Sequence, residues 1–131
     1  MALFPGETLS TGAIAKATGI SEGYLEQLFI PLKKAGIVRG FRGPRGGYVT
    51  DRAPDQITAG EILRTMEGSL KPTDCASEDF EKTGLCPMSG NCGSRNIWVE
   101  LYGEINNCVD SITLADLVEA YRAMDKAENP I

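Results

Sequence analysis

The chain has 131 residues, of which 42% are hydrophobic and 24% are charged. This length is enough for one domain with a hydrophobic core. No apolar run approaches the roughly 18 residues that a membrane-spanning helix needs, and no signal peptide opens the chain. The composition therefore predicts a cytoplasmic protein without a membrane segment. An enzyme is not expected either, because the chain has no histidine and no apparent nucleophile–base pair.

The net charge of −5 conceals an asymmetry along the chain. Residues 1–53 contain seven Lys or Arg and four Asp or Glu, which leaves +3. Residues 54–131 contain six Lys or Arg and fourteen Asp or Glu, which leaves −8. A basic segment attracts phosphate and an acidic one is repelled by it, so the two parts are expected to have different functions.

The basic front part carries the pattern of a helix-turn-helix. A short helix is predicted over residues 10–17, with a tight turn at Thr18–Gly19 after it. Ser21 is the expected N-cap of a second helix, which runs to about Ala35 and stops at Gly36. The apolar residues of this helix follow helical spacing: Tyr24, Leu25, Leu28, Leu32 and Ala35.

Two short strands, 37–39 and 48–50, are predicted on either side of a glycine-rich loop that contains two arginines. Helix, turn, helix and hairpin in this order are typical of a winged helix-turn-helix, a DNA-binding arrangement. We therefore expect residues 1–53 to form the DNA-binding region. The predicted fold is mainly α, with a small β-hairpin wing and a long dimerisation helix.

The acidic remainder divides into four segments by its turn residues and helical spacing. A capping box at Thr58 and Glu61 opens the first helix, and Thr113 with Asp116 opens the last one. The four segments are a connecting helix (54–73), a cysteine loop (74–93), dimerisation helices (94–124) and a frayed tail (125–131).

A long apolar seam on the helix after the loop predicts a homodimer. Its residues step by three and four: Trp98, Leu101, Ile105, Cys108 and Ile112. Little else in so small a chain is available to pack against this seam, so a second copy is the expected partner. Two-fold symmetry would place two recognition helices on a palindromic operator. Cys108, as part of the seam, is expected to be a buried and inert thiol.

The second helix is the predicted major-groove reader. Side chains of its first two turns would face base edges or phosphates: Ser21, Glu22, Tyr24, Glu26 and Gln27. Glu26 can accept a hydrogen bond from a cytosine amino group, and Gln27 can read adenine. Alternatively, these two side chains are ordinary solvated residues of a helix surface.

Three cations flank this predicted reader. Arg42 and Arg45 lie on the glycine-rich loop, which suits insertion into a narrow minor groove. Lys33 lies near the end of the second helix and could contact phosphate. The other interpretations are a tight hairpin with exposed arginines, and a lysine that offsets the helix dipole.

Cys75, Cys86 and Cys92 lie in one polar loop, separated by ten and five residues. Three soft thiolates in an irregular segment are a typical ligand set for a metal centre. Cys92 comes just before the helix expected from Ser94, and a helix N-terminus with Arg95 beside it favours a thiolate. The thiols could instead form a disulfide, hold zinc or remain unused.

Four stretches form one pattern that covers nearly the whole chain: Ile20–Ser21 with residues 24–28, the run 42–48, the helix within 57–68, and the Trp98 helix after the cysteines. This pattern resembles the IscR/NsrR/CymR-like (Rrf-two) family of bacterial transcription regulators. The resemblance implies a dimeric winged-helix regulator of double-stranded DNA. It also implies that the residues at positions Ser21, Glu26 and Arg42 recognise DNA.

In cluster-binding members of that family, three loop cysteines hold a [2Fe–2S] or [4Fe–4S] cluster, and by position these are Cys75, Cys86 and Cys92. The chain departs from the family in two ways. Family chains usually begin with a helix ahead of the position of Met1, and IscR-like members have a histidine ligand where Arg95 stands here. The fourth ligand is therefore unassigned, and the candidates are Asp74, Glu78, Asp79, Glu81, Cys108 and an exogenous thiol or water.

The sequence thus predicts a bacterial transcription regulator, acting as a repressor, that senses iron–sulfur status, redox state or nitric oxide through an iron–sulfur cluster. Two alternatives stay open. One is a regulator of the same fold with zinc, a disulfide or no metal, controlled by a partner protein or a small molecule. The other is a protein-interaction domain that no longer binds DNA.

Overall fold

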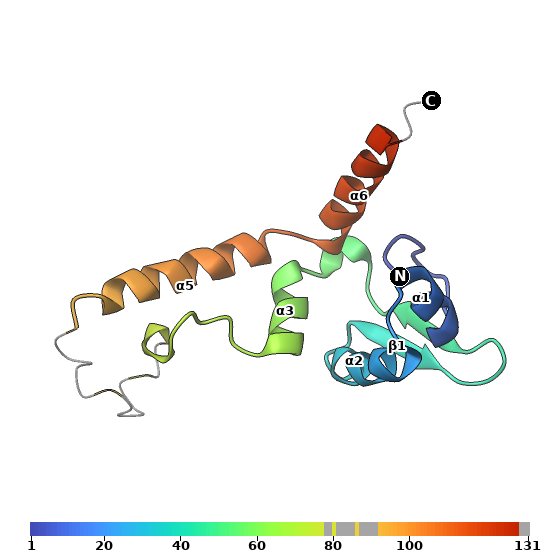
Figure 1. Ribbon diagram of the computed structural model, residues 1–131, viewed down its shortest axis with the longest axis horizontal. Helices are drawn as coiled ribbons and strands as arrows, with labels where there is room; N and C mark the ends of the chain where they lie inside the picture. Colours follow the sequence, from blue (N-terminus) through green and yellow to red (C-terminus); the bar gives the residue numbers. More distant parts are fainter. Residues whose placement is uncertain (78–79, 81–85, 87–91, 129–131) are drawn as a thin grey trace.

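The computed structural model describes residues 1–77, Phe80, Cys86 and residues 92–128 (Figure 1). Along the chain, the elements are α1 (Thr11–Thr18), α2 (Glu22–Lys34), β1 (Val38–Phe41), β2 (Gly47–Thr50), η1 (Pro54–Gln56), α3 (Ala59–Glu67), η2 (Asp74–Ala76), α5 (Arg95–Asp110) and α6 (Leu114–Glu128). The helix-turn-helix and the hairpin form one body, from which α5 extends on one side and α6 on another. The prediction of a mainly α, winged fold with a long helix is confirmed.

Local capping signals produce the helix-turn-helix. Ser10 Oγ accepts a hydrogen bond from the backbone N–H of Ala13 at 3.1 Å, which starts α1. Gly19 ends α1 in the left-handed region, at a φ of 74°. Ser21 Oγ then accepts from the backbone N–H of Tyr24 at 3.3 Å and starts α2. The tight spacing of these caps sets the turn between the two helices.

The core lies beneath α2 and the base of the hairpin. Its buried members come from α2, β1 and the segments beside them: Leu25, Phe29, Ile37, Val38 and Ile57. The ring of Phe29 stacks on Tyr48 with centroids 4.1 Å apart. Tyr24, which the spacing placed with the apolar residues of α2, is instead 56% exposed. The buried face of α2 is centred on Leu25 and Phe29, so Tyr24 lies at its margin.

The wing is an antiparallel hairpin in which Val38 pairs with Thr50 and Phe41 with Gly47. A further bridge links β2 to the segment before α1, because Leu9 and Tyr48 exchange backbone hydrogen bonds of 2.9 and 2.8 Å. The bridge places the base of the wing directly beside the N-cap of α1. The helix-turn-helix and the hairpin are therefore tied together by backbone pairing as well as by their apolar core.

The α5–α6 junction is joined to the start of α3 by a second short bridge. The backbone N–H of Ala59 donates to the carbonyl of Ile112 at 2.8 Å, and that of Leu114 donates to the carbonyl of Ile57 at 2.9 Å. Thr113 Oγ1 accepts from the Asp116 N–H at 3.1 Å, and the Asp116 carboxylate accepts from the Thr113 N–H at 2.8 Å. This reciprocal capping box, which the sequence predicted, starts α6 immediately after the bridge.

The last helices differ from the sequence expectations in one respect and leave another dependent on the dimer. The proposed frayed tail begins at Asp125, but α6 continues through Glu128, and the rest of that tail lies outside the described residues. In the single chain Cys108 is exposed and Leu101 on the same seam is 41% exposed, so the predicted burial of Cys108 depends on a second copy that covers the seam. Helical spacing identifies which residues share a face, whereas burial depends on what covers that face.

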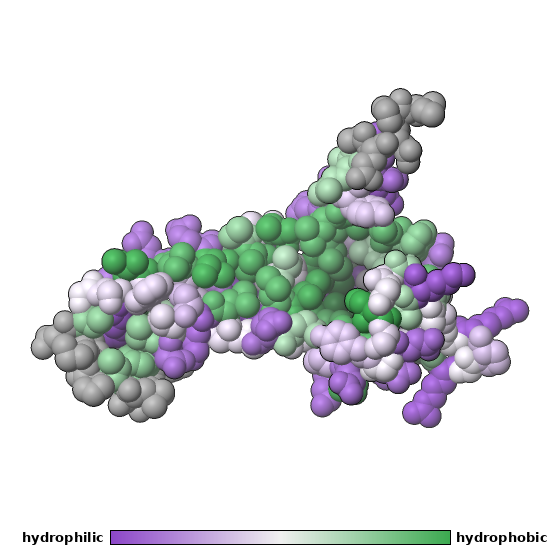
Figure 2. Space-filling view, viewed as in Figure 1, coloured by the Kyte–Doolittle hydropathy of each residue, from purple (hydrophilic) through white to green (hydrophobic). Residues whose placement is uncertain are grey.

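Exposed apolar residues lie on both long helices, within the predicted seam at Leu101 and outside it at five further positions: Ile97 and Val99 on α5, and Leu117, Tyr121 and Met124 on α6. An apolar groove of about 400 Å³ adjoins the base of α6, and its walls include Leu3, Phe29, Leu32, Ile62, Leu114 and Leu117. Figure 2 shows apolar surface running along α5 to the centre of the molecule. Among the described residues, no helix is both long and apolar enough to cross a bilayer.

Candidate nucleic-acid interface and cysteine segment

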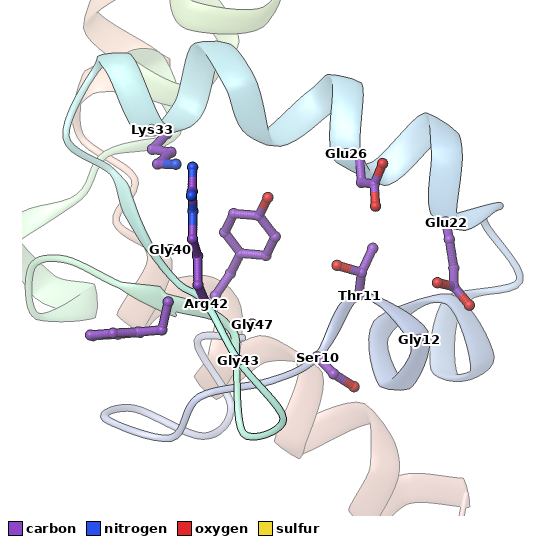
Figure 3. A pocket seen from close by; sticks show the side chains of 13 residues that line it. Ser10, Thr11, Gly12, Glu22, Glu26, Lys33, Gly40, Arg42, Gly43 and Gly47 are labelled. Carbon is purple, nitrogen blue, oxygen red and sulfur yellow. The ribbon is translucent and has the colours of Figure 1, made fainter.

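A polar pocket of about 460 Å³ lies between α1, α2 and the wing (Figure 3). Glu22, Glu26 and Lys33 project toward it from α2, and Arg42 extends from the wing toward the end of α2 that carries Lys33. Two cations at one end thus face two carboxylates at the other. Such a surface offers both phosphate-binding and amino-group-accepting chemistry.

The structure gathers half of the eight predicted DNA-contacting residues around this pocket. The four that line it are Glu22, Glu26, Lys33 and Arg42. The other four are exposed but lie outside its walls: Ser21, Tyr24, Gln27 and Arg45. Ser21 is already engaged as the N-cap of α2, so its hydroxyl has an established structural role.

Several wall residues were not among the predicted contacts, including the hydroxyl-bearing Ser10, Thr11 and Tyr48. Thr11 opens α1 beside Glu22, whose carboxylate also approaches Gly12 in the first turn of α1. The cap at Ser10 was a usable sequence signal for the start of α1. The position of α1 across from α2 depends on how the two helices pack, and no local sequence pattern predicts that packing.

The two wall cations are available to a ligand. Within the part of the chain that the structure describes, neither Lys33 nor Arg42 forms an ion pair, and neither does Arg45. Arg39, by contrast, pairs with Asp51 at 3.5 Å and lies over the ring of Phe41 at 5.3 Å. Arg39 therefore supports the base of the wing, whereas Lys33, Arg42 and Arg45 keep unpaired charge at the surface.

The cysteine segment is anchored on the first turn of α5 by Arg95. The backbone N–H of Arg95 donates to the carbonyl of Cys92 at 3.3 Å, and the Arg95 Nε donates to the carbonyl of Cys75 at 3.3 Å. The guanidinium also lies over the ring of the buried Phe80, 5.6 Å from its centroid. Cys75 and Cys92, seventeen positions apart, are thus both hydrogen-bonded to Arg95, the first through its side chain and the second through its backbone.

The environment of Cys92 favours its thiolate. The Ser94 hydroxyl lies 3.1 Å from Cys92 Sγ. Hydrogen bonding from the Ser94 side chain and backbone, followed by the N–H and charge of Arg95, lowers the pKa of the Cys92 thiol. The expectation of an activated thiol at the start of this helix agrees with that direction.

The three loop thiols have the donor chemistry of a metal centre, but the described geometry does not assemble them. All four cysteines are free thiols. Among the described residues, no three Cys, Asp or Glu side chains gather closely enough to hold a metal ion. Of the proposed fourth ligands, Asp74 pairs with Lys71 at 3.3 Å and Cys108 is exposed on α5. Glu78, Asp79 and Glu81 lie outside the described residues.

Comparison with known proteins identifies the relatives of this chain. Residues 1–120 match the family model Rrf2, described as an iron-dependent transcriptional regulator. The HTH-type transcriptional regulator CymR of Bacillus subtilis is 40% identical over 108 residues, which are 82% of this chain and 70% of CymR. The regulator IscR of Cronobacter sakazakii is 33% identical over 115 residues, which are 88% of this chain and 68% of IscR.

The structural comparison agrees. The solved structure of B. subtilis CymR, described as the global cysteine regulator, aligns with a TM-score of 0.71 at 37% identity. The alignment covers 91% of this chain and 84% of that chain. At this identity, the match indicates a shared family as well as a shared fold.

Proposed function

The chain belongs to the Rrf2 family of transcription regulators, and we propose that it binds a palindromic DNA operator as a homodimer and acts by repression. It is a regulator and not an enzyme. In this proposal residues 1–53 bind DNA and residues 94–124 form the dimer. The helix within 54–73 connects the DNA-binding region to the later segments. The first turns of α2 enter the major groove, and the wing follows the adjoining minor groove.

The observation that supports DNA binding most directly is the polar pocket. Lys33 and Arg42 bring unpaired positive charge to the same end of the pocket, where a phosphate would be attracted. Glu26, one turn into α2, supplies an acceptor for a cytosine amino group. The pocket thus combines phosphate attraction with a group that discriminates between bases.

The dimer proposal rests on the apolar surface of the two long helices. Apolar surface runs along α5 to the centre of the molecule (Figure 2), and the exposed Leu117 and Tyr121 of α6 line the apolar groove. Patches of this kind mark interaction sites, because leaving them in water forgoes hydrophobic stabilisation. A second copy presents the same face and can cover it with two-fold symmetry.

Selection of bound duplexes from a random DNA library tests the DNA proposal. We expect enrichment of an inverted repeat whose half-sites are about one helical turn apart. The logarithm of the binding constant is expected to fall linearly with the logarithm of salt concentration, with a slope of several units. Failure to enrich any sequence, together with weak binding at low salt, would contradict DNA recognition and favour a protein-interaction role.

We further propose that the cysteine segment receives the regulatory signal, with an iron–sulfur cluster held by Cys75, Cys86 and Cys92. The three thiols, the description of the family model as iron-dependent and the IscR relatives support this occupant. The second candidate is a thiol or zinc site without a cluster. It is favoured by the separation of the ligands among the described residues and by the similarity to a protein described as a cysteine regulator.

Metal analysis of anaerobically purified protein decides between these candidates. If the cluster is present, the protein should be coloured and contain iron and sulfide in equal amounts. Cys92→Ser should abolish both, and Cys108→Ser, which removes the exposed thiol on α5, should retain both. Colourless protein that contains zinc or no metal would exclude the cluster and leave the thiol-based candidate.

A further inference from the structure

Helix α3 lies between α5 and the DNA-binding half. The orientation of α5 relative to that half therefore depends on the contacts that α3 makes with each of them. On one side, Ile62 packs against the core cluster that includes Leu25 and Phe29 of α2. The Glu61 carboxylate also pairs with Arg52, whose Nη1 donates to the carbonyl of Gln56 at 3.2 Å. These contacts fix α3 to the body that carries the recognition helix.

On its other side, α3 contacts α5 through one arginine. Arg64 Nη1 donates to Asp110 Oδ1 at 2.7 Å, and Nη2 donates to Asp110 Oδ2 at 2.8 Å. Nη2 also donates to Asn106 Oδ1 at 2.9 Å, one turn earlier on α5. This fork is the geometry in which Arg binds a carboxylate with the greatest directional specificity. The hydrogen bond from Arg64 lowers the pKa of Asp110, so the carboxylate stays charged at neutral pH.

The backbone of α3 is adapted to this contact at Gly60. A Cβ at this position would overlap Oδ1 of Asp110 and lie 3.0 Å from both Arg64 Nη1 and Val109 Cγ2. Any larger residue would therefore displace the carboxylate from the guanidinium. Gly60 thus permits the close approach of α3 and α5 that the fork requires.

The backbone bridge between the α3 entry and the α5–α6 junction provides a second attachment point. A single short bridge allows a helix to rotate about it, whereas a second directional contact removes that freedom. The Tyr102 hydroxyl, 3.3 Å from Ser69 Oγ, continues the line of contacts two turns along α5. Tyr102, Asn106 and Asp110 are spaced by four, so they share one face of α5.

We propose that the Arg64–Asp110–Asn106 contact fixes the direction of α5 relative to α2, and thereby the separation of the two recognition helices in the dimer. The second half of this inference rests on the proposed DNA-binding function, but the first half does not. The pair is partly exposed, so its loss affects orientation more than folding. The contact is a positioning element through which changes at the cysteine segment, on the first turn of α5, reach the DNA-binding half.

The first test measures orientation without DNA. Spin-labelled noncanonical residues at the exposed positions Ile30 of α2 and Glu104 of α5 report the distance between the two helices. Labelled chains are diluted into unlabelled protein so that distances within one chain dominate. We expect a narrow distribution for the native contact, and a distinctly broader one for both Arg64→Gln and Gly60→Ala. Lys126→Gln, at an exposed position of α6 outside residues 94–124, is the matched control and should leave the distribution narrow.

The second test measures coupling to DNA. Arg64→Gln should lower affinity for the full palindrome by roughly tenfold, while half-site affinity and melting temperature stay close to the parent values. An unchanged distance distribution in both contact variants would overturn the proposal, whatever the DNA result. If the parent protein binds no palindrome, the proposed function fails, and the distance measurement still decides whether the contact orients α5.

Discussion

Replacement of Arg42 by alanine is expected to weaken operator binding by about 1–2 kcal/mol, which is roughly five- to thirtyfold. Arg42 is exposed on the wing, lines the polar pocket and forms no ion pair with the described part of the chain. Its charge is therefore free to meet phosphate or a narrow minor groove. Because the side chain makes no such internal contact, the substitution should leave the melting temperature nearly unchanged.

The measurement is a salt titration of operator affinity for the parent and the variant. Loss of one cation–phosphate contact should reduce the logarithmic salt slope by about one unit. Lys126→Ala removes one positive charge from α6, away from the wing and outside residues 94–124, and should change neither affinity nor slope appreciably (Figure 1). Equal effects of the two substitutions would show that only net charge matters, and would contradict a specific role for the wing.

The DNA-binding half was predictable from sequence because its determinants are local. The caps at Ser10 and Ser21 and the left-handed glycines at Gly19 and Gly36 each act within a few residues. The order of elements follows from these signals, and so does the fold class. The polar pocket was only half predictable, because Thr11 comes to it through the packing of α1 against α2.

The attachment of α5 was not predictable from the same kind of signal. Arg64 and Asp110 are 46 positions apart, and the residues next to each in the sequence carry no pattern that predicts this ion pair. The seam on α5 was correctly recognised as apolar, but spacing carries no information about whether a partner covers it. Likewise, the spacing of Cys75 and Cys92 does not predict that Arg95 donates a hydrogen bond to the backbone carbonyl of each.

The wing depends on a close backbone approach at Gly47, so Gly47→Ala is expected to cause a large loss of stability. Gly47 has a φ of 150°, in the region that favours glycine. A Cβ there would overlap the carbonyl oxygen of Leu9 and lie 2.8 Å from the backbone N of Ser10. Backbone atoms cannot rotate away as a flexible side chain can, so the Leu9–Tyr48 bridge must open.

Overpacking of this kind costs about 1–3 kcal/mol, which corresponds to a fall in melting temperature of roughly 10 °C at fixed protein concentration. Gly23→Ala is the matched control, since nothing lies within 4 Å of a Cβ at that helical position and alanine is the better helix former. It should leave the melting temperature unchanged or slightly higher.

An equally stable Gly47→Ala variant would contradict the close approach of β2 to the start of α1. A destabilised variant that also loses operator affinity would show that the Leu9–Tyr48 bridge holds the wing in its DNA-binding position, because the substituted residue itself adds and removes no charge.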